Sequence, residues 1–204
     1  MPSSKSNLKS PAAQRIGMGE SGPETGFIDT YTGERFHPLD PEPATIRLED
    51  IAQGLANTCR YSGQCRFFYS VGLHSLYVSE EVARDYGPLV QLYGLLHDAS
   101  EAYLADVPGP VKNGFSDYQA TENRIQNAVW TAFDLSDPDE TETTAVKEAD
   151  VRLLHYEADT LIPTNDWTEA QDDVDYDLKV DSRSDIRERF VERGQSLLRD
   201  IEAA

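Results

Sequence analysis

Apolar residues recur every three or four positions along most of this chain, a spacing that is typical of helices with one buried face. The first segment with this pattern runs from Leu48 to Cys59, and the second runs from about residue 70 to residue 85. The second segment should end at Gly87 and Pro88, because this pair stops helices. Residues 88–104 are apolar along one side, so we expect a single, central buried helix there.

The second half of the chain predicts three more helices, over residues 116–133, 143–159 and 183–203. Ser116 is a candidate N-cap of the first of them, because a serine side chain can accept a hydrogen bond from the opening turn. Residues 163–182 are acidic and lack periodicity, so we expect them to be irregular. The pattern as a whole indicates an all-α fold.

The N-terminal part of the chain lacks the helical spacing. Residues 1–26 are rich in Ser, Gly, Pro and Lys, and we interpret them as a flexible tail. Residues 28–36 combine short strand-like runs with turn residues and predict a small hairpin, with Gly33 near its turn. We therefore expect a tail followed by one domain over residues 27–204, which is long enough to bury a sizeable core.

The net charge is −19, from 18 basic and 37 acidic residues. This charge argues against a nucleic-acid binder, because phosphates would be repelled over most of the surface. An acidic surface is also typical of proteins from high-salt habitats, where salt screens the repulsion. The sequence shows neither a membrane-spanning apolar run nor a signal peptide. We expect a cytoplasmic protein that does not bind membranes, with a cellular, viral or high-salt origin left open.

The candidate chemistry lies in two histidines and two aspartates: His74, the doublet His97–Asp98, and Asp150. The doublet is embedded in apolar sequence, and an unpaired buried charge is costly, so it needs partners. His74 or Asp150 alone would be weak evidence, and each gains weight from the doublet. Imidazoles with carboxylates suit Mn, Fe, Co, Ni or Zn better than Ca. Glu101 follows on the same helix face, where its carboxylate could reach a water molecule at the site.

The other histidines and the cysteines carry less information. We interpret His37 as structural or solvated, and His155 as a surface or packing residue of its helix. Cys59 and Cys65 lie six positions apart without a zinc-binding pattern. Reduced thiols are the favoured interpretation, and a disulfide between them stays open.

Several stretches of the chain resemble a known superfamily. They are Ile46–Ala52, Cys59–Tyr61, Phe68–Val71 and, most specifically, His97–Lys112. Over about residues 38–160 the chain resembles the HD-domain metal-dependent phosphohydrolases. Within that superfamily it is most similar to the small nucleotidases, the phage-type dATP triphosphohydrolases and the bacterial 5′-deoxyribonucleotidases.

The resemblance implies an HD-domain helical bundle and a role for each matching residue. The implied metal ligands are His74, His97, Asp98 and Asp150, which would hold a divalent Co, Mn, Zn, Fe or Ni ion. A second divalent ion such as Mg stays open. The implied catalytic residues are Glu101 and Asp106. The implied substrate residues are Arg60 and Lys112, which would neutralise phosphate oxygens, and Tyr61, which would stack on a base.

The function that the resemblance implies is hydrolysis of a deoxynucleotide. Our first expectation is a dATP triphosphohydrolase that releases deoxyadenosine and triphosphate. Two alternatives stay open: a 5′-deoxyribonucleotidase that acts on dNMPs, and a non-catalytic nucleotide-binding or interaction module. We expect a small-molecule nucleotide as the partner, and apolar faces on the later helices favour a homo-oligomer.

Overall fold

Helices make up most of the computed structural model, which describes residues 26–179 and 182–204. In chain order the elements are β1 (Ile28–Asp29), β2 (Arg35–Phe36), the 3-10 turn η2 (Pro43–Thr45), α1 (Leu48–Asn57), the 3-10 turn η3 (Arg60–Gly63), α2 (Val71–Val82), α3 (Pro88–Leu96), α4 (Glu101–Leu104), α5 (Gly109–Lys112), α6 (Ser116–Ala132), α7 (Glu140–Leu161) and α8 (Arg183–Glu202). The predicted all-α class is confirmed. The flexible tail predicted for residues 1–26 lies outside the described residues, except for residue 26.

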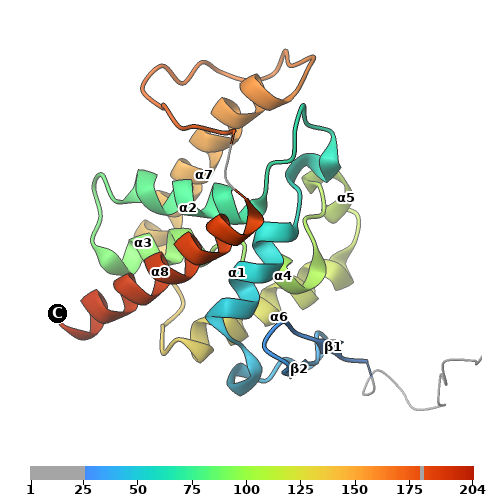
Figure 1. Ribbon diagram of the computed structural model, residues 1–204, viewed down its shortest axis with the longest axis vertical. Helices are drawn as coiled ribbons and strands as arrows, with labels where there is room; N and C mark the ends of the chain where they lie inside the picture. The colour runs from blue at the N-terminus through green and yellow to red at the C-terminus, as the bar shows by residue number, and fades with distance from the viewer. Residues whose placement is uncertain (1–25, 180–181) are drawn as a thin grey trace, which may run out of the picture.

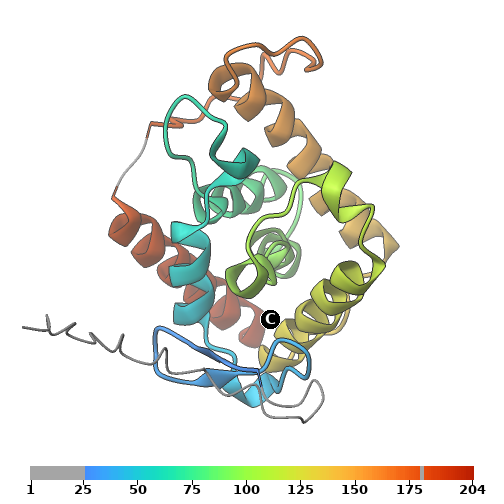
Figure 2. The same cartoon turned by 90° about the vertical axis from the view of Figure 1, so that its right-hand side faces the viewer.

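The helices α2 and α3 pack against each other at the centre, and α1, α7 and α8 surround them (Figures 1 and 2). Every residue of α2 except Glu80 is buried. A helix that is covered on all sides must find partners for its polar side chains. Ser79 donates its hydroxyl proton to the carbonyl of Gln91, and His74 pairs with carboxylates described below.

Local capping sets where the helices begin. Ser70 caps α2, because its side chain accepts a hydrogen bond from the backbone N–H of Leu73. The helix α7 begins before the predicted residue 143, because Asp139 and Glu142 form a capping box. The prediction that Ser116 caps α6 is wrong, since Ser116 is the first helical residue and makes no capping bond there.

The single helix predicted over residues 88–104 is also wrong. The chain forms α3, then a turn over residues 97–100, and then the short helix α4. Within the turn the backbone bonds span three residues, as from the N–H of Ala99 to the carbonyl of Leu96. Apolar positions continue through the turn, so their spacing does not reveal it. His97 and Asp98 therefore lie in this turn and not in a continuous helix.

The predicted hairpin over residues 28–36 is present. Its strands β1 and β2 are antiparallel, with Ile28 opposite Phe36, and Gly33 has a φ of 91° in the connecting turn. Asp50 of α1 ties the hairpin down, accepting hydrogen bonds of 2.7 and 2.8 Å from the backbone and hydroxyl of Thr32. The ring of Phe36 stacks on Tyr103 of α4 with centroids 3.9 Å apart. The hairpin thus supports the helix that carries Glu101.

The described part of the acidic segment, residues 163–179 and 182, contains neither helix nor strand, as predicted. It forms the loop that projects beyond α7 in Figure 1. The backbone carbonyl of Tyr176 accepts a hydrogen bond from Tyr156, and the hydroxyl of Tyr176 donates to Glu81. Among the described helices, none combines the length and the apolar composition that crossing a membrane requires.

Candidate metal centre

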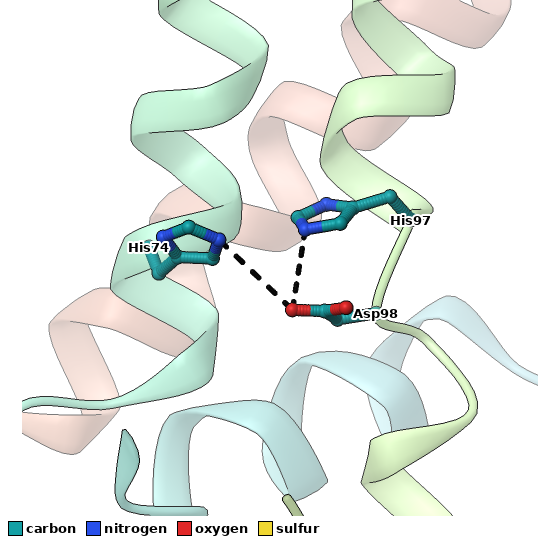
Figure 3. Close-up of side chains that lie close together, drawn as sticks. All are labelled: His74, His97 and Asp98. Atoms are coloured by element: carbon teal, nitrogen blue, oxygen red, sulfur yellow. Dashed lines mark ion pairs between the residues drawn. The ribbon is translucent and has the colours of Figure 1, made fainter. Parts of the chain in front are cut away.

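Three side chains from two elements meet beside the broken helix. His74 comes from the middle of α2, and His97 and Asp98 come from the turn after α3 (Figure 3). Their potential ligand atoms all lie within 4.8 Å of one another. The Oδ2 atom of Asp98 is 3.2 Å from the Nε2 atom of His97 and 4.0 Å from that of His74. The structure therefore brings together three of the four predicted metal ligands in a compact group.

A hydrogen bond at the Nδ1 atom orients each imidazole. The Nδ1–H of His74 donates to the carboxylate of Glu157 at 2.7 Å, and that of His97 donates to the carbonyl of Gly94 at 2.8 Å. Because these oxygens can only accept, each ring carries a proton on Nδ1, and its Nε2 atom is the one that faces the aspartates. Both Nε2 atoms are buried, and neither makes a well-aligned hydrogen bond, although each has an aspartate oxygen within 3.2 Å. Imidazoles held in this way are typical of metal ligands, so the donor set fits a divalent cation.

Asp150 reaches the group from α7. Its Oδ1 atom lies 3.0 Å from the Nε2 atom of His74, although Asp150 does not belong to the compact group of three. Burial alone would raise the pKa of Asp98 and Asp150, but the imidazoles of His74 and His97 hold both pKa values below their usual range. Both side chains are therefore carboxylates, the form that binds metals.

Without a cation, the imidazoles compensate this negative charge. Burial by itself would lower the pKa of His97, but Asp98 and Asp150 outweigh burial and raise that pKa to about 9. The pKa of His74 is also raised, because Glu157 and Asp150 outweigh burial and the positive charge of Arg60. A cation bound here would replace protons that the two rings otherwise hold.

Glu101 opens α4, next to the ligands. Its side chain is buried, and its Oε2 atom has no hydrogen-bond partner. Burial, with the nearby charges of Asp98 and Asp106, raises the pKa of Glu101 to about 9. Asp106 is half-buried, and burial and the charge of Asp98 raise its pKa above the usual value. Both predicted catalytic carboxyls thus lie in the electrostatic field of the candidate ligands.

Two basic side chains flank the group. The guanidinium of Arg60 lies 3.7 Å from Asp98 and 3.1 Å from Glu157. The ammonium of Lys112 lies 3.5 Å from Glu101 and 2.6 Å from Glu122. The structure therefore places Arg60 beside the candidate ligand Asp98, and Lys112 beside the predicted catalytic residue Glu101.

Tyr61, the third predicted substrate residue, follows Arg60 in η3. Its backbone has a φ of 56°, in the left-handed region that side chains disfavour. The guanidinium of Arg60 lies 5.4 Å from the centre of the Tyr61 ring, and the Tyr61 hydroxyl donates to Glu157 at 3.3 Å. Tyr61 and Arg60 thus lie next to each other, and both contact Glu157.

Sequence reasoning missed Glu157, which is fully buried on α7. Burial would raise its pKa, but His74 and Arg60 lower it below the usual value, so the group is a carboxylate. Glu157 follows Asp150 by seven residues, which is about two helical turns and places both on one face. That spacing was the available signal, and it is weak in a chain with 37 acidic residues.

The surface has two relevant hollows, one next to the candidate metal ligands and one away from them. A cavity of about 210 Å³ adjoins it, with His97 and Asp150 in its wall beside the aromatic rings of Tyr93 and Trp130. A larger hollow of about 870 Å³ runs along the exposed face of α7 against the loop, and its wall includes none of the candidate ligands. Volume alone therefore does not locate the candidate site.

The remaining histidines and the cysteines lie outside the candidate ligand group. His155 accepts a hydrogen bond from the backbone N–H of Glu169 and contacts the ring of Trp167, which is the packing role predicted for it. His37 packs against the ring of Phe27. Cys59 and Cys65 are free thiols with their sulfur atoms 3.8 Å apart.

No family model matches this chain. It is 42% identical over 110 residues to an uncharacterised protein of Rhodobacter capsulatus, covering 51% of this chain and 56% of that relative. It is 34% identical over 128 residues to YfdR, an uncharacterised protein of Escherichia coli strain K12, covering 63% of this chain and 68% of YfdR. On this similarity, the chain belongs to the same protein family as YfdR.

Proposed function

We propose that this protein is an HD-type, metal-dependent phosphohydrolase of deoxynucleotides, with dATP as its first candidate substrate. The observation that carries the proposal is the grouping of the buried Nε2 atoms of His74 and His97 with the carboxylate of Asp98, while Asp150 lies 3.0 Å from His74. Without a cation, these nitrogens face the aspartates as ion pairs that depend on protonated imidazoles. A divalent transition metal would satisfy both and would compensate the carboxylates of Asp98 and Asp150.

The residues around the group suit hydrolysis of a phosphate ester. A bound divalent cation would stabilise charge on phosphoryl oxygens and lower the pKa of water. Its positive charge would also favour the ionised form of Glu101, which could then accept a proton from water. Arg60 and Lys112 would neutralise phosphate oxygens, making a local basic exception on a chain of net charge −19.

Glu101 favours an enzyme over a passive binding module. A buried carboxyl group with an unsatisfied oxygen destabilises a fold, so stability gives no reason to keep it. A group of that kind next to candidate metal ligands has the environment expected of a catalytic acid or base. The preference for a triphosphate, and for adenine, rests on the resemblance of Cys59–Tyr61 and of the interval between Asp98 and Asp150 to the phage-type enzymes.

The test is a substrate panel with protein that has been stripped of metal and reloaded with Mn²⁺ or Co²⁺. We expect deoxyadenosine and inorganic triphosphate from dATP, and no product from the stripped protein. His97→Asn should abolish turnover, while His155→Asn, outside the candidate ligand group on α7, should keep it. Phosphate released from dNMPs alone would instead identify a 5′-deoxyribonucleotidase. No product from any nucleotide would reject an enzyme of this class and favour the binding module.

A further inference from the structure

The buried carboxylate of Glu157 contacts both a candidate metal ligand and the candidate substrate residues. The Oε1 atom of Glu157 accepts hydrogen bonds of 2.7 Å from His74 and from the hydroxyl of Tyr69. Its Oε2 atom accepts a hydrogen bond of 3.3 Å from Tyr61 and lies 3.1 Å from the Nε atom of Arg60. One oxygen therefore holds a candidate metal ligand, and the other holds the two candidate substrate residues.

We propose that Glu157 is a positioning residue that couples the metal centre to the phosphate-binding side of the site. A carboxylate only accepts hydrogen bonds, so it keeps one proton of His74 on Nδ1 and leaves Nε2 as the ring nitrogen at which a cation can replace a proton. The same carboxylate holds the guanidinium of Arg60 near Asp98, at 3.7 Å. The inference rests on the metal site of the proposed function, and it is independent of which nucleotide is hydrolysed.

A purely structural role for Glu157 can be separated from this one, because the chain offers a matched control. Glu81 is also buried, with 6% of its surface exposed, and it too pairs with basic side chains and a tyrosine hydroxyl. Its partners are Arg84, Arg152 and Tyr176, none of which belongs to the candidate site. Glu81→Gln therefore measures the general cost of neutralising a buried, paired carboxylate in this fold.

The decisive comparison is between Glu157→Gln and Glu81→Gln. Glutamine keeps the size of the side chain, but its neutral oxygen is a weaker acceptor than a carboxylate, and its NH₂ group faces donors on either side. His74 then becomes a poorer ligand. Calorimetry with Mn²⁺ should show a loss of affinity of about 10–100-fold for Glu157→Gln. The visible spectrum of the Co²⁺-loaded variant should also change, while Glu81→Gln should keep the affinity and spectrum of the wild type.

A milder variant covers the case in which Glu157→Gln does not fold, as judged by circular dichroism. Tyr69→Phe removes one hydrogen bond to the same oxygen and leaves every candidate ligand in place, so we expect a several-fold loss of Mn²⁺ affinity. Wild-type affinity and an unchanged Co²⁺ spectrum in a folded Glu157→Gln overturn the proposal. If Glu157→Gln does not fold, wild-type affinity in Tyr69→Phe overturns it.

These measurements involve no nucleotide, so they are independent of the activity assay. A wild-type protein that binds Mn²⁺ but hydrolyses no nucleotide would reject the proposed function, and the comparison of Glu157→Gln with Glu81→Gln would still decide the role of Glu157. Conversely, an active wild type whose Glu157→Gln variant binds Mn²⁺ normally would leave the hydrolase intact and remove this role.

Discussion

The ammonium group of Lys112 lies 3.5 Å from the Oε1 atom of Glu101. This contact joins α5 to the beginning of α4 and places a positive charge beside a carboxyl whose other oxygen has no partner. Lys112 lowers the pKa of Glu101, against the larger effects of burial, Asp98 and Asp106 that raise it. Lys112 should therefore act on hydrolysis in two ways. It would neutralise phosphate oxygens of the substrate, and it would favour the ionised form of Glu101.

Lys112→Met should reveal both effects. We expect kcat/KM to fall by roughly 10–100-fold, because a charge-assisted contact to phosphate is lost. The limb of the pH profile that reports Glu101 should move to higher pH, because the nearby positive charge is gone. Steady-state kinetics over a range of pH measures both. Lys179→Met, outside the site, is the control, and an unchanged profile in Lys112→Met would contradict the coupling to Glu101.

Glu101→Gln should separate activity from stability. Turnover should fall by about 10²–10⁴-fold, because a proton acceptor is lost, while Mn²⁺ affinity stays near that of the wild type. The metal-free variant should be more stable than the wild type by about 1–3 kcal/mol at mildly alkaline pH, because folding of the wild type must return a proton to Glu101 that the unfolded chain has released. The pKa of Glu101 is raised to about 9, so the advantage should grow as the pH rises toward that value.

Urea unfolding and activity assays test the two halves of this prediction. Glu148→Gln, an exposed change on α7, should alter neither quantity. A Glu101→Gln variant with full turnover would remove the catalytic role of Glu101 while leaving the metal site untouched.

Much of the fold and of the candidate site could be predicted from the sequence. Apolar spacing identified the main helices, and the doublet His97–Asp98 stood out because it interrupts apolar sequence. The break after α3 could not be predicted, because Leu95, Leu96 and Ala99 continue the apolar spacing through the turn, and all three are buried. The break depends on packing against other helices, which periodicity does not report.

The contacts around the candidate ligands could not be predicted from the sequence either. Glu157 and Glu122 were not singled out, because glutamates on charged helices are usually solvated. Their importance arises from tertiary contacts, between His74 and a residue 83 positions away and between Lys112 and Glu122. Residue type and spacing thus indicated the candidate ligands, while the groups that orient those ligands required the fold.

Gly54→Ala should disturb the support of Glu101. A Cβ atom added to Gly54 of α1 would lie 2.7 Å from the Cβ and carbonyl oxygen of Ala102 in α4. Because the obstacle includes backbone, we expect α1 and α4 to separate at a cost of about 1–3 kcal/mol, with reduced turnover. Gly87→Ala is the control: its added Cβ meets no atom within 4 Å, so only a helix cap weakens, at less than about 1 kcal/mol. Equal urea midpoints for the two variants would count against this close contact.

The protonation of His97 links pH, stability and metal binding. Asp98 and Asp150 outweigh burial and raise the pKa of His97 to about 9, above the ordinary value of about 6.5. Between these values the folded, metal-free protein holds a proton that the unfolded chain has released. The stability that His97 contributes is therefore complete below about pH 6.5 and is lost as the pH rises toward 9.

Metal binding should follow the opposite trend, because the cation must displace that proton. In the presence of a chelator we expect the Tm to fall between about pH 6.5 and about pH 8.5, whereas the increase in Tm caused by Mn²⁺ should grow over the same range. Differential scanning calorimetry with and without Mn²⁺ measures both trends. His97→Asn cannot titrate, so its metal-free Tm should fall less steeply and its response to Mn²⁺ should be small. A metal-free wild type that becomes more stable toward alkaline pH, or a Mn²⁺ effect that shrinks there, would show that His97 does not exchange its proton for a cation.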